Sequence, residues 1–142
     1  MLNLLFRSAV TWTGLGLLSG LYYRELTKAN DFSGATQLAV AHTHALALGT
    51  LMLLVLLALV AALGIDDRRF RWGVATWQVG LGMTFGMQLV KGTLQVLGDG
   101  ASESAALAGI AGLGHITLTA AFVLLFIGIG SAVRSRTAVV ES

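Results

Sequence analysis

The sequence contains no cysteine and no proline, and only 11% of its 142 residues are charged. The absence of cysteine excludes disulfides, thiolate metal sites and iron–sulfur clusters. A soluble domain carries roughly 25% charged residues, more than twice the charged fraction of this chain. The hydrophobic fraction of this chain is correspondingly high, at 56%. A water-soluble protein of this length could not bury so much apolar surface. We therefore expect a lipid bilayer to surround most of the chain.

Long apolar stretches make up nearly the whole chain, and about 20 apolar residues suffice to cross the hydrocarbon core of a bilayer. The sequence predicts an all-α, integral membrane four-helix bundle in a single domain, 1–142, with spans at about 8–23, 36–63, 72–97 and 105–133. The 18 glycines predict helices that pack closely. A cleaved signal peptide is the alternative for the short first span, although no small-x-small cleavage site precedes Arg24.

The basic residues lie mostly at chain ends and linkers that we assign to one side of the membrane. They are Arg7, Arg68, Arg69, Arg71, Arg134 and Arg136. The linker 98–104, which follows the third span, carries Asp99 and Glu103 and no base. The positive-inside rule then places both termini in the cytoplasm. Because these charges flank apolar spans, they indicate topology and give no nucleic-acid-binding surface.

Few ionisable residues lie inside the predicted spans, and such residues are costly in a bilayer unless they serve a function. They include His42 and His44 in the second span, Lys91 in the third and His115 in the fourth. At a rise of about 1.5 Å per residue, all four lie at one level in the outer half of the membrane. Histidines that only pack between helices would not need to lie at a common depth. We interpret the shared depth as a sign of a candidate site, and structural histidines are the simpler alternative.

His42 and His44 are two residues apart, so their side chains point about 200° apart around a helix. They cannot bind one ion from a single helix face. In an isolated bundle one ring would face hydrocarbon and leave its N–H unsatisfied. An oligomer in which protein covers both sides of the second span avoids this cost. The spacing therefore predicts a site formed between chains.

Neutral imidazole is a good ligand for iron, copper or zinc, and the apolar spans hold no carboxylate for a hard cation. Two histidines beside an apolar pocket suit heme b (protoporphyrin IX iron), and copper is less favoured. His42 and His44 are the candidate ligands, and His115 is a further ligand or a hydrogen-bonding partner. Lys91 and Arg24, near the outer rim, are candidates for contacts with the heme propionates.

Residues 41–50, AHTHALALGT, are similar to the His-x-His…Leu-Gly helix in relatives of the heme–copper oxidase catalytic subunit. The whole chain resembles a small bacterial four-helix membrane family of unknown function beside that superfamily, which implies the bacterial cytoplasmic (inner) membrane. The oxidase subunits consist of three arcs of four helices, and this chain resembles one arc. The resemblance implies a homotrimer that rebuilds the ring. A heme would lie between neighbouring subunits, with His42 of one and His44 of the next as axial ligands.

The chain also departs from the oxidases, since no second histidine cluster matches their copper site and no histidine–tyrosine pair is found. Oxygen reduction and proton pumping are therefore not carried over. The resemblance implies electron transfer or heme-linked redox or gas sensing, and it leaves open whether the chain is an enzyme. Other interpretations remain: a copper or non-heme iron membrane enzyme, a small-solute transporter with histidine proton relays, and a scaffolding subunit.

Overall fold

The computed structural model describes residues 1–140, with side chains up to Ala138. Every regular element in the described residues is a helix, which confirms the all-α class. The elements are α1 (Leu2–Ala29), α2 (Gln37–His44), the π-helix η1 (Ala45–Leu51), α3 (Met52–Leu63), α4 (Arg68–Val96), the 3₁₀-helix η2 (Gly100–Glu103) and α5 (Ala105–Val140). Because α2, η1 and α3 follow one another without a break, the chain forms four long rods.

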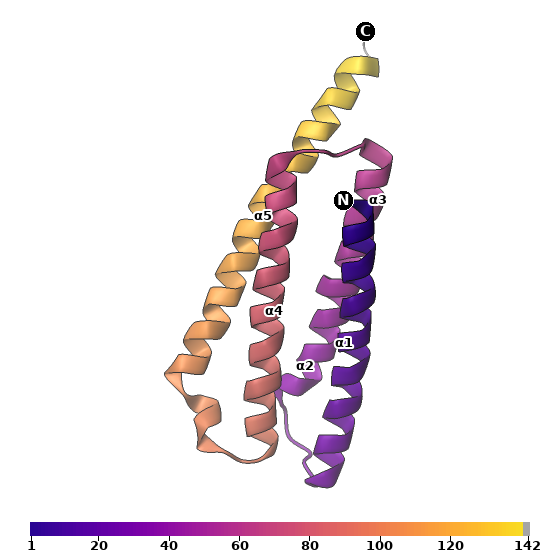
Figure 1. Cartoon of the computed structure of the whole chain (residues 1–142). Coiled ribbons are helices and arrows are strands. Elements are labelled where there is room, and N and C mark those ends of the chain that lie inside the picture. Colours follow the sequence, from indigo (N-terminus) through magenta and orange to yellow (C-terminus); the bar gives the residue numbers. More distant parts are fainter. Residues whose placement is uncertain (141–142) are drawn as a thin grey trace.

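The rods lie side by side along their lengths, and the start of α1 and the described end of α5 are at the same end of the bundle (Figure 1). Rod α4 packs against α5 on one side and against α2 on the other, while α1 packs along α2, η1 and α3 (Figure 1). In the described part of the chain α1 and α5 do not pack against each other. The rods therefore form a bent row that stays open between α1 and α5, although α1 also touches α4 and α3 also touches α5.

Three rods are long and apolar enough to cross a membrane: Leu2–Ala29, Gln37–Leu63 and the described part of α5, Ala105–Ala138. Rod α4 is 29 residues long and runs beside them, but its composition does not meet the same standard. The prediction of four long helices is confirmed, and the apolar character expected of the third span, about 72–97, is weaker than that of the other three.

Local sequence sets several of the helix ends. The Thr36 side chain accepts a hydrogen bond from the Leu38 N–H at 3.3 Å, as an N-cap residue does, and its hydroxyl donates to the Gly92 carbonyl of α4 at 2.9 Å. Asp67 caps α4 by accepting from backbone N–H groups of its first turn. Gly64 ends α3 with φ at 64°, a left-handed conformation that favours glycine.

Glycine allows the rods to approach each other, as the composition predicts. A Cβ atom on Gly80 of α4 would lie 2.9 Å from the backbone nitrogen of Leu118 on α5. A Cβ atom on Gly92 would collide with the backbone of Leu38 at the start of α2. These two positions bring α4 close to both of its neighbours.

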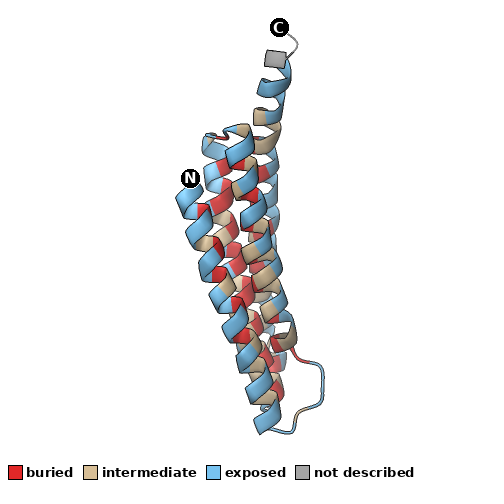
Figure 2. Cartoon of the chain, turned by 90° about the vertical axis from the view of Figure 1, so that its right-hand side faces the viewer, coloured by how far each residue is buried: buried red, intermediate tan, exposed pale blue. Residues whose placement is uncertain are grey.

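The buried residues form a stripe along the inner faces of the rods, and the outer faces are exposed (Figure 2). Trp77 is fully buried in this core and donates its indole N–H to the Leu48 carbonyl at 3.0 Å. The outer faces are strongly apolar: Leu18 is 65% exposed and Ile116 is 67% exposed. An apolar outer surface is what a bilayer would contact.

Candidate functional site

His42 lies against α1. A Cβ atom on Gly20 would be 3.6 Å from the Cβ atom of His42, an ordinary contact distance, so the His42 ring packs against α1 at this position. The Nδ1 atom of His42 is buried and has no hydrogen-bond partner, while Nε2 lies 3.5 Å from the Thr43 hydroxyl. An unpaired buried polar atom costs about 1–3 kcal/mol. This imidazole is therefore incompletely satisfied within one chain.

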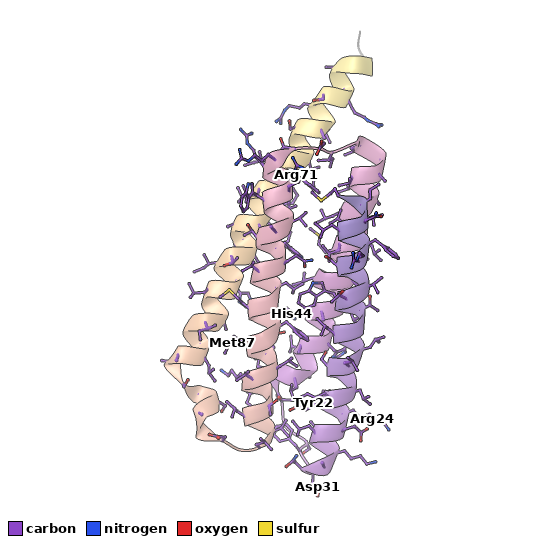
Figure 3. The ribbon with its side chains drawn as sticks, viewed as in Figure 1. Tyr22, Arg24, Asp31, His44, Arg71 and Met87 are labelled. Carbon is purple, nitrogen blue, oxygen red and sulfur yellow. The ribbon has the colours of Figure 1, made fainter. Side chains whose placement is uncertain are left out.

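His44 has a different environment, on the side of α2 next to α4 (Figure 3). Gln37, seven residues earlier and so on the same helix face, donates its backbone N–H to the Gln95 side chain of α4 at 2.8 Å. The His44 Nδ1–H donates to the Val40 carbonyl at 3.2 Å. A carbonyl only accepts, so this bond fixes the proton on Nδ1 and leaves the Nε2 lone pair free. Metal-binding histidines commonly have such a second hydrogen bond.

His115 is oriented in the same way, because its Nδ1–H donates to the Ala111 carbonyl of its own helix at 2.9 Å. It lines a cavity of about 220 Å³ between α4 and α5, which we call the α4–α5 cavity. Lys91 lines the same cavity. The other polar residues of its wall are Gln37, Thr84 and Gln88.

The structure thus separates the predicted site residues into two groups. His115 and Lys91 share the α4–α5 cavity, which neither His42 nor His44 lines. Arg24 is in neither group: it is exposed and lies 3.7 Å from Glu25, its neighbour in sequence. Within the described residues no three His, Asp or Glu side chains come together as a metal site. Any metal bound by His42 or His44 therefore needs a cofactor or a second chain.

Two features of the site were not predicted. Thr84 was overlooked, although its spacing from Gln88 and Lys91 (84, 88, 91) is that of one helix face and could have indicated it. The π-helix η1, Ala45–Leu51, follows His44 directly. Such π-helical turns are rare in proteins, and those that occur are often found at functional sites. No residue pattern in this stretch distinguishes it from an ordinary apolar helix.

The residues fit a heme only in part. The free Nε2 of His44 and the unpaired Nδ1 of His42 are consistent with ligation, and apolar side chains such as Val40 are exposed on the same helix. The two rings lie on different faces of α2, so they cannot bind the two sides of one iron within a chain. A heme fits only where another subunit supplies the second ligand.

Comparison with known proteins gives a family. No curated protein and no solved structure matches the chain. A family model matches residues 2–132 and so covers all of α1 to α4 and most of α5. The prediction of a family of unknown function is confirmed: the chain belongs to the family described as "Protein of unknown function (DUF2871)".

Proposed function

We propose that the chain is a b-type heme protein of the bacterial cytoplasmic membrane that transfers electrons or senses redox state or a gas. In this proposal all four rods cross the membrane, both termini are cytoplasmic, and the η2 end faces outward. The chain forms a homotrimer in which His42 of one subunit and His44 of the next are the axial ligands. The observation that carries the proposal is the position of the two imidazoles on different faces of α2, each with a ring nitrogen lacking a strong partner.

The polar residues of α4 support its place in the membrane despite its lower hydropathy. Gln78 accepts a hydrogen bond from the Trp12 indole at 2.8 Å, and Gln95 accepts one from the Gln37 backbone. Gln88 is 8% exposed, and Lys91 lines the α4–α5 cavity. These polar groups face protein, as they must in a helix surrounded by other helices in lipid.

The row of rods supports the oligomer. A closed four-helix bundle would bring α1 next to α5, but in the described residues these two rods lie at opposite ends of the row. An open row of helices leaves both of its sides for neighbours. Three such rows closing into a ring would cover the parts of His42 and His44 that stay exposed in a single chain, where both residues are half-buried.

Each residue of the site has a distinct part in this proposal. A bound heme supplies one-electron redox chemistry through its iron. The bond from His44 Nδ1 to the Val40 carbonyl holds that ring in a fixed orientation, and the apolar helix faces exclude water. Lys91 and Arg24 remain the candidates for propionate contacts, and Lys91 is the better placed because Gln37, on the His44 face, lines the same cavity. His115 is assigned a position outside the axial pair.

The test is an optical spectrum of the detergent-purified chain reconstituted with heme. We expect Soret and α bands of a six-coordinate b-type heme on reduction. His42→Ala and His44→Ala should each weaken heme binding at least tenfold, or convert the spectrum to a five-coordinate form. The matched control is His115→Ala, which removes a third histidine at the same level and should leave the bands unchanged. Native mass measurement of the loaded protein should give a trimer.

A protein that stays colourless with added heme, or that keeps its bands in both variants, would rule the proposal out. Elemental analysis distinguishes the main alternative, because copper or iron bound without porphyrin would indicate a metal enzyme instead.

A further inference from the structure

The α4–α5 cavity is a second candidate site, and residues of a single chain form it. Its volume of about 220 Å³ has room for several water molecules, and it is partly open at the surface, where Ala108 and His115 are exposed. Rods α4 and α5 supply most of its wall, and Gln37 closes it from α2. It requires neither a heme nor a second subunit.

The charge around the cavity is of one sign. Lys91 is half-buried in the wall and forms no ion pair with any of the described residues. No carboxylate lines the cavity, and its other titratable residue is His115. An ammonium group in a region of low dielectric constant is costly unless a negative charge lies near it. The wall of the cavity therefore favours an anion.

A buried amide gives the second, independent indication. Gln88 is 8% exposed, it lines the cavity, and its Oε1 atom has no hydrogen-bond partner. The Oε1 atom is itself inaccessible, so the donor that a ligand could meet is the NH₂ group, which is not among the buried unpaired atoms. Thr84 also has an unpaired hydroxyl, but that oxygen packs against Gly114 and gives no such indication.

We propose that the α4–α5 cavity binds one small carboxylate or inorganic oxyanion. Lys91 supplies the compensating charge, and the Gln88 amide donates a hydrogen bond to an anion oxygen. The wall also includes the apolar side chains of Met87 and Leu107, and the volume of about 220 Å³ suits a small ligand. Water alone could satisfy the amide, but it would leave the ammonium group without a counter-charge.

The test uses the full chain in detergent and follows its thermal unfolding. Sodium formate, acetate and nitrate are titrated separately at an ionic strength held constant with bulkier gluconate. Because a ligand that binds only the folded state raises the unfolding midpoint, at least one probe should give a saturable rise. Lys91→Met, which keeps an apolar side chain of similar length, should weaken the apparent affinity at least tenfold, and Gln88→Leu should weaken it several-fold.

The matched control is Lys28→Met, which removes an exposed lysine in the last turn of α1, outside the cavity. It should leave the titration unchanged. Lys91→Arg keeps the charge and should retain binding, which separates loss of the site from loss of the fold. An unfolding midpoint that does not depend on any of the three anions would overturn the proposal. Equal losses in the Lys91→Met and Lys28→Met variants would overturn it as well.

A heme propionate could also occupy this place, and a heme-free chain distinguishes the two sources. The double variant His42→Ala/His44→Ala cannot carry the proposed heme but keeps the cavity. Saturable binding by that variant supports a free anion whether or not the heme proposal holds. If heme displaces the anion from the wild-type chain and not from the double variant, the site is supported and its occupant in the loaded protein is the propionate.

Discussion

The two halves of the bundle satisfy their buried polar groups differently. We define the η2 half as residues 16–47 and 82–118, and the opposite half as the remaining described residues. In the opposite half, the indoles of Trp12 and Trp77 both donate hydrogen bonds across rods, to Gln78 at 2.8 Å and to Leu48 at 3.0 Å. The buried polar side-chain atoms that lack a partner are His42 Nδ1, Thr84 Oγ1 and Gln88 Oε1, and all of them belong to the η2 half.

This difference indicates that the opposite half mainly stabilises the fold and that the η2 half carries the candidate sites. Sequences are usually consistent with their fold everywhere except at functional sites, where local costs are retained. The opposite half follows that rule, because none of the buried polar side-chain atoms in its described residues lacks a partner. The η2 half leaves the His42 imidazole unpaired next to α1 and the Gln88 amide unpaired beside the α4–α5 cavity, as is expected of sites that a ligand completes. Substitutions of the same kind in the two halves should therefore have different consequences.

The largest effect on stability should come from Trp77→Ala in the opposite half. Trp77 is fully buried, its ring packs edge-to-face on Phe122 at 4.7 Å, and its indole N–H is bonded. Removing such a side chain costs about 3–5 kcal/mol. Thermal unfolding in detergent, followed by circular dichroism, measures the loss. Trp72→Ala is the matched control, because Trp72 is 58% exposed and its removal should change the midpoint little.

A smaller loss is expected for Gln78→Leu. The substitution leaves the buried Trp12 indole N–H without its acceptor, which costs about 1–3 kcal/mol. The double variant Trp12→Phe/Gln78→Leu removes donor and acceptor together and should be more stable than the sum of its single substitutions implies. Strict additivity of the two substitutions would show that the bond contributes nothing to the folded state.

Much of the fold could be predicted from the sequence, because hydropathy identifies the apolar centre of a helix. It does not identify the helix ends, which depend on capping and on polar residues beyond the apolar part. The first predicted span, 8–23, is accordingly shorter than α1, which extends from Leu2 to Ala29. The π-helix η1 was missed because a wide turn in an apolar stretch has no residue signature.

The sequence could predict the directions of the histidine side chains and their depth in the membrane. It could not predict which of the site residues would lie together. The helical repeat alone indicated that His42 and His44 diverge, and the structure associates them with α1 and with the α4 side of α2. The order of rods around the bundle is not encoded in periodicity. Consequently, the sequence could not tell that His115 and Lys91 would share a cavity with Gln88.

The smallest effect is also the one that tests the comparison most directly. Gln88→Leu, ten residues along α4 from Gln78, makes the same chemical change in the η2 half. Here no partner loses its bond, and a buried oxygen without a partner is removed, so the ligand-free chain should gain about 1 kcal/mol in unfolding free energy. The gain should accompany weaker anion binding, since stabilising changes at functional sites commonly reduce function. A loss as large as that of Gln78→Leu would show that the Gln88 amide is already paired in the folded protein, and that the two halves do not differ.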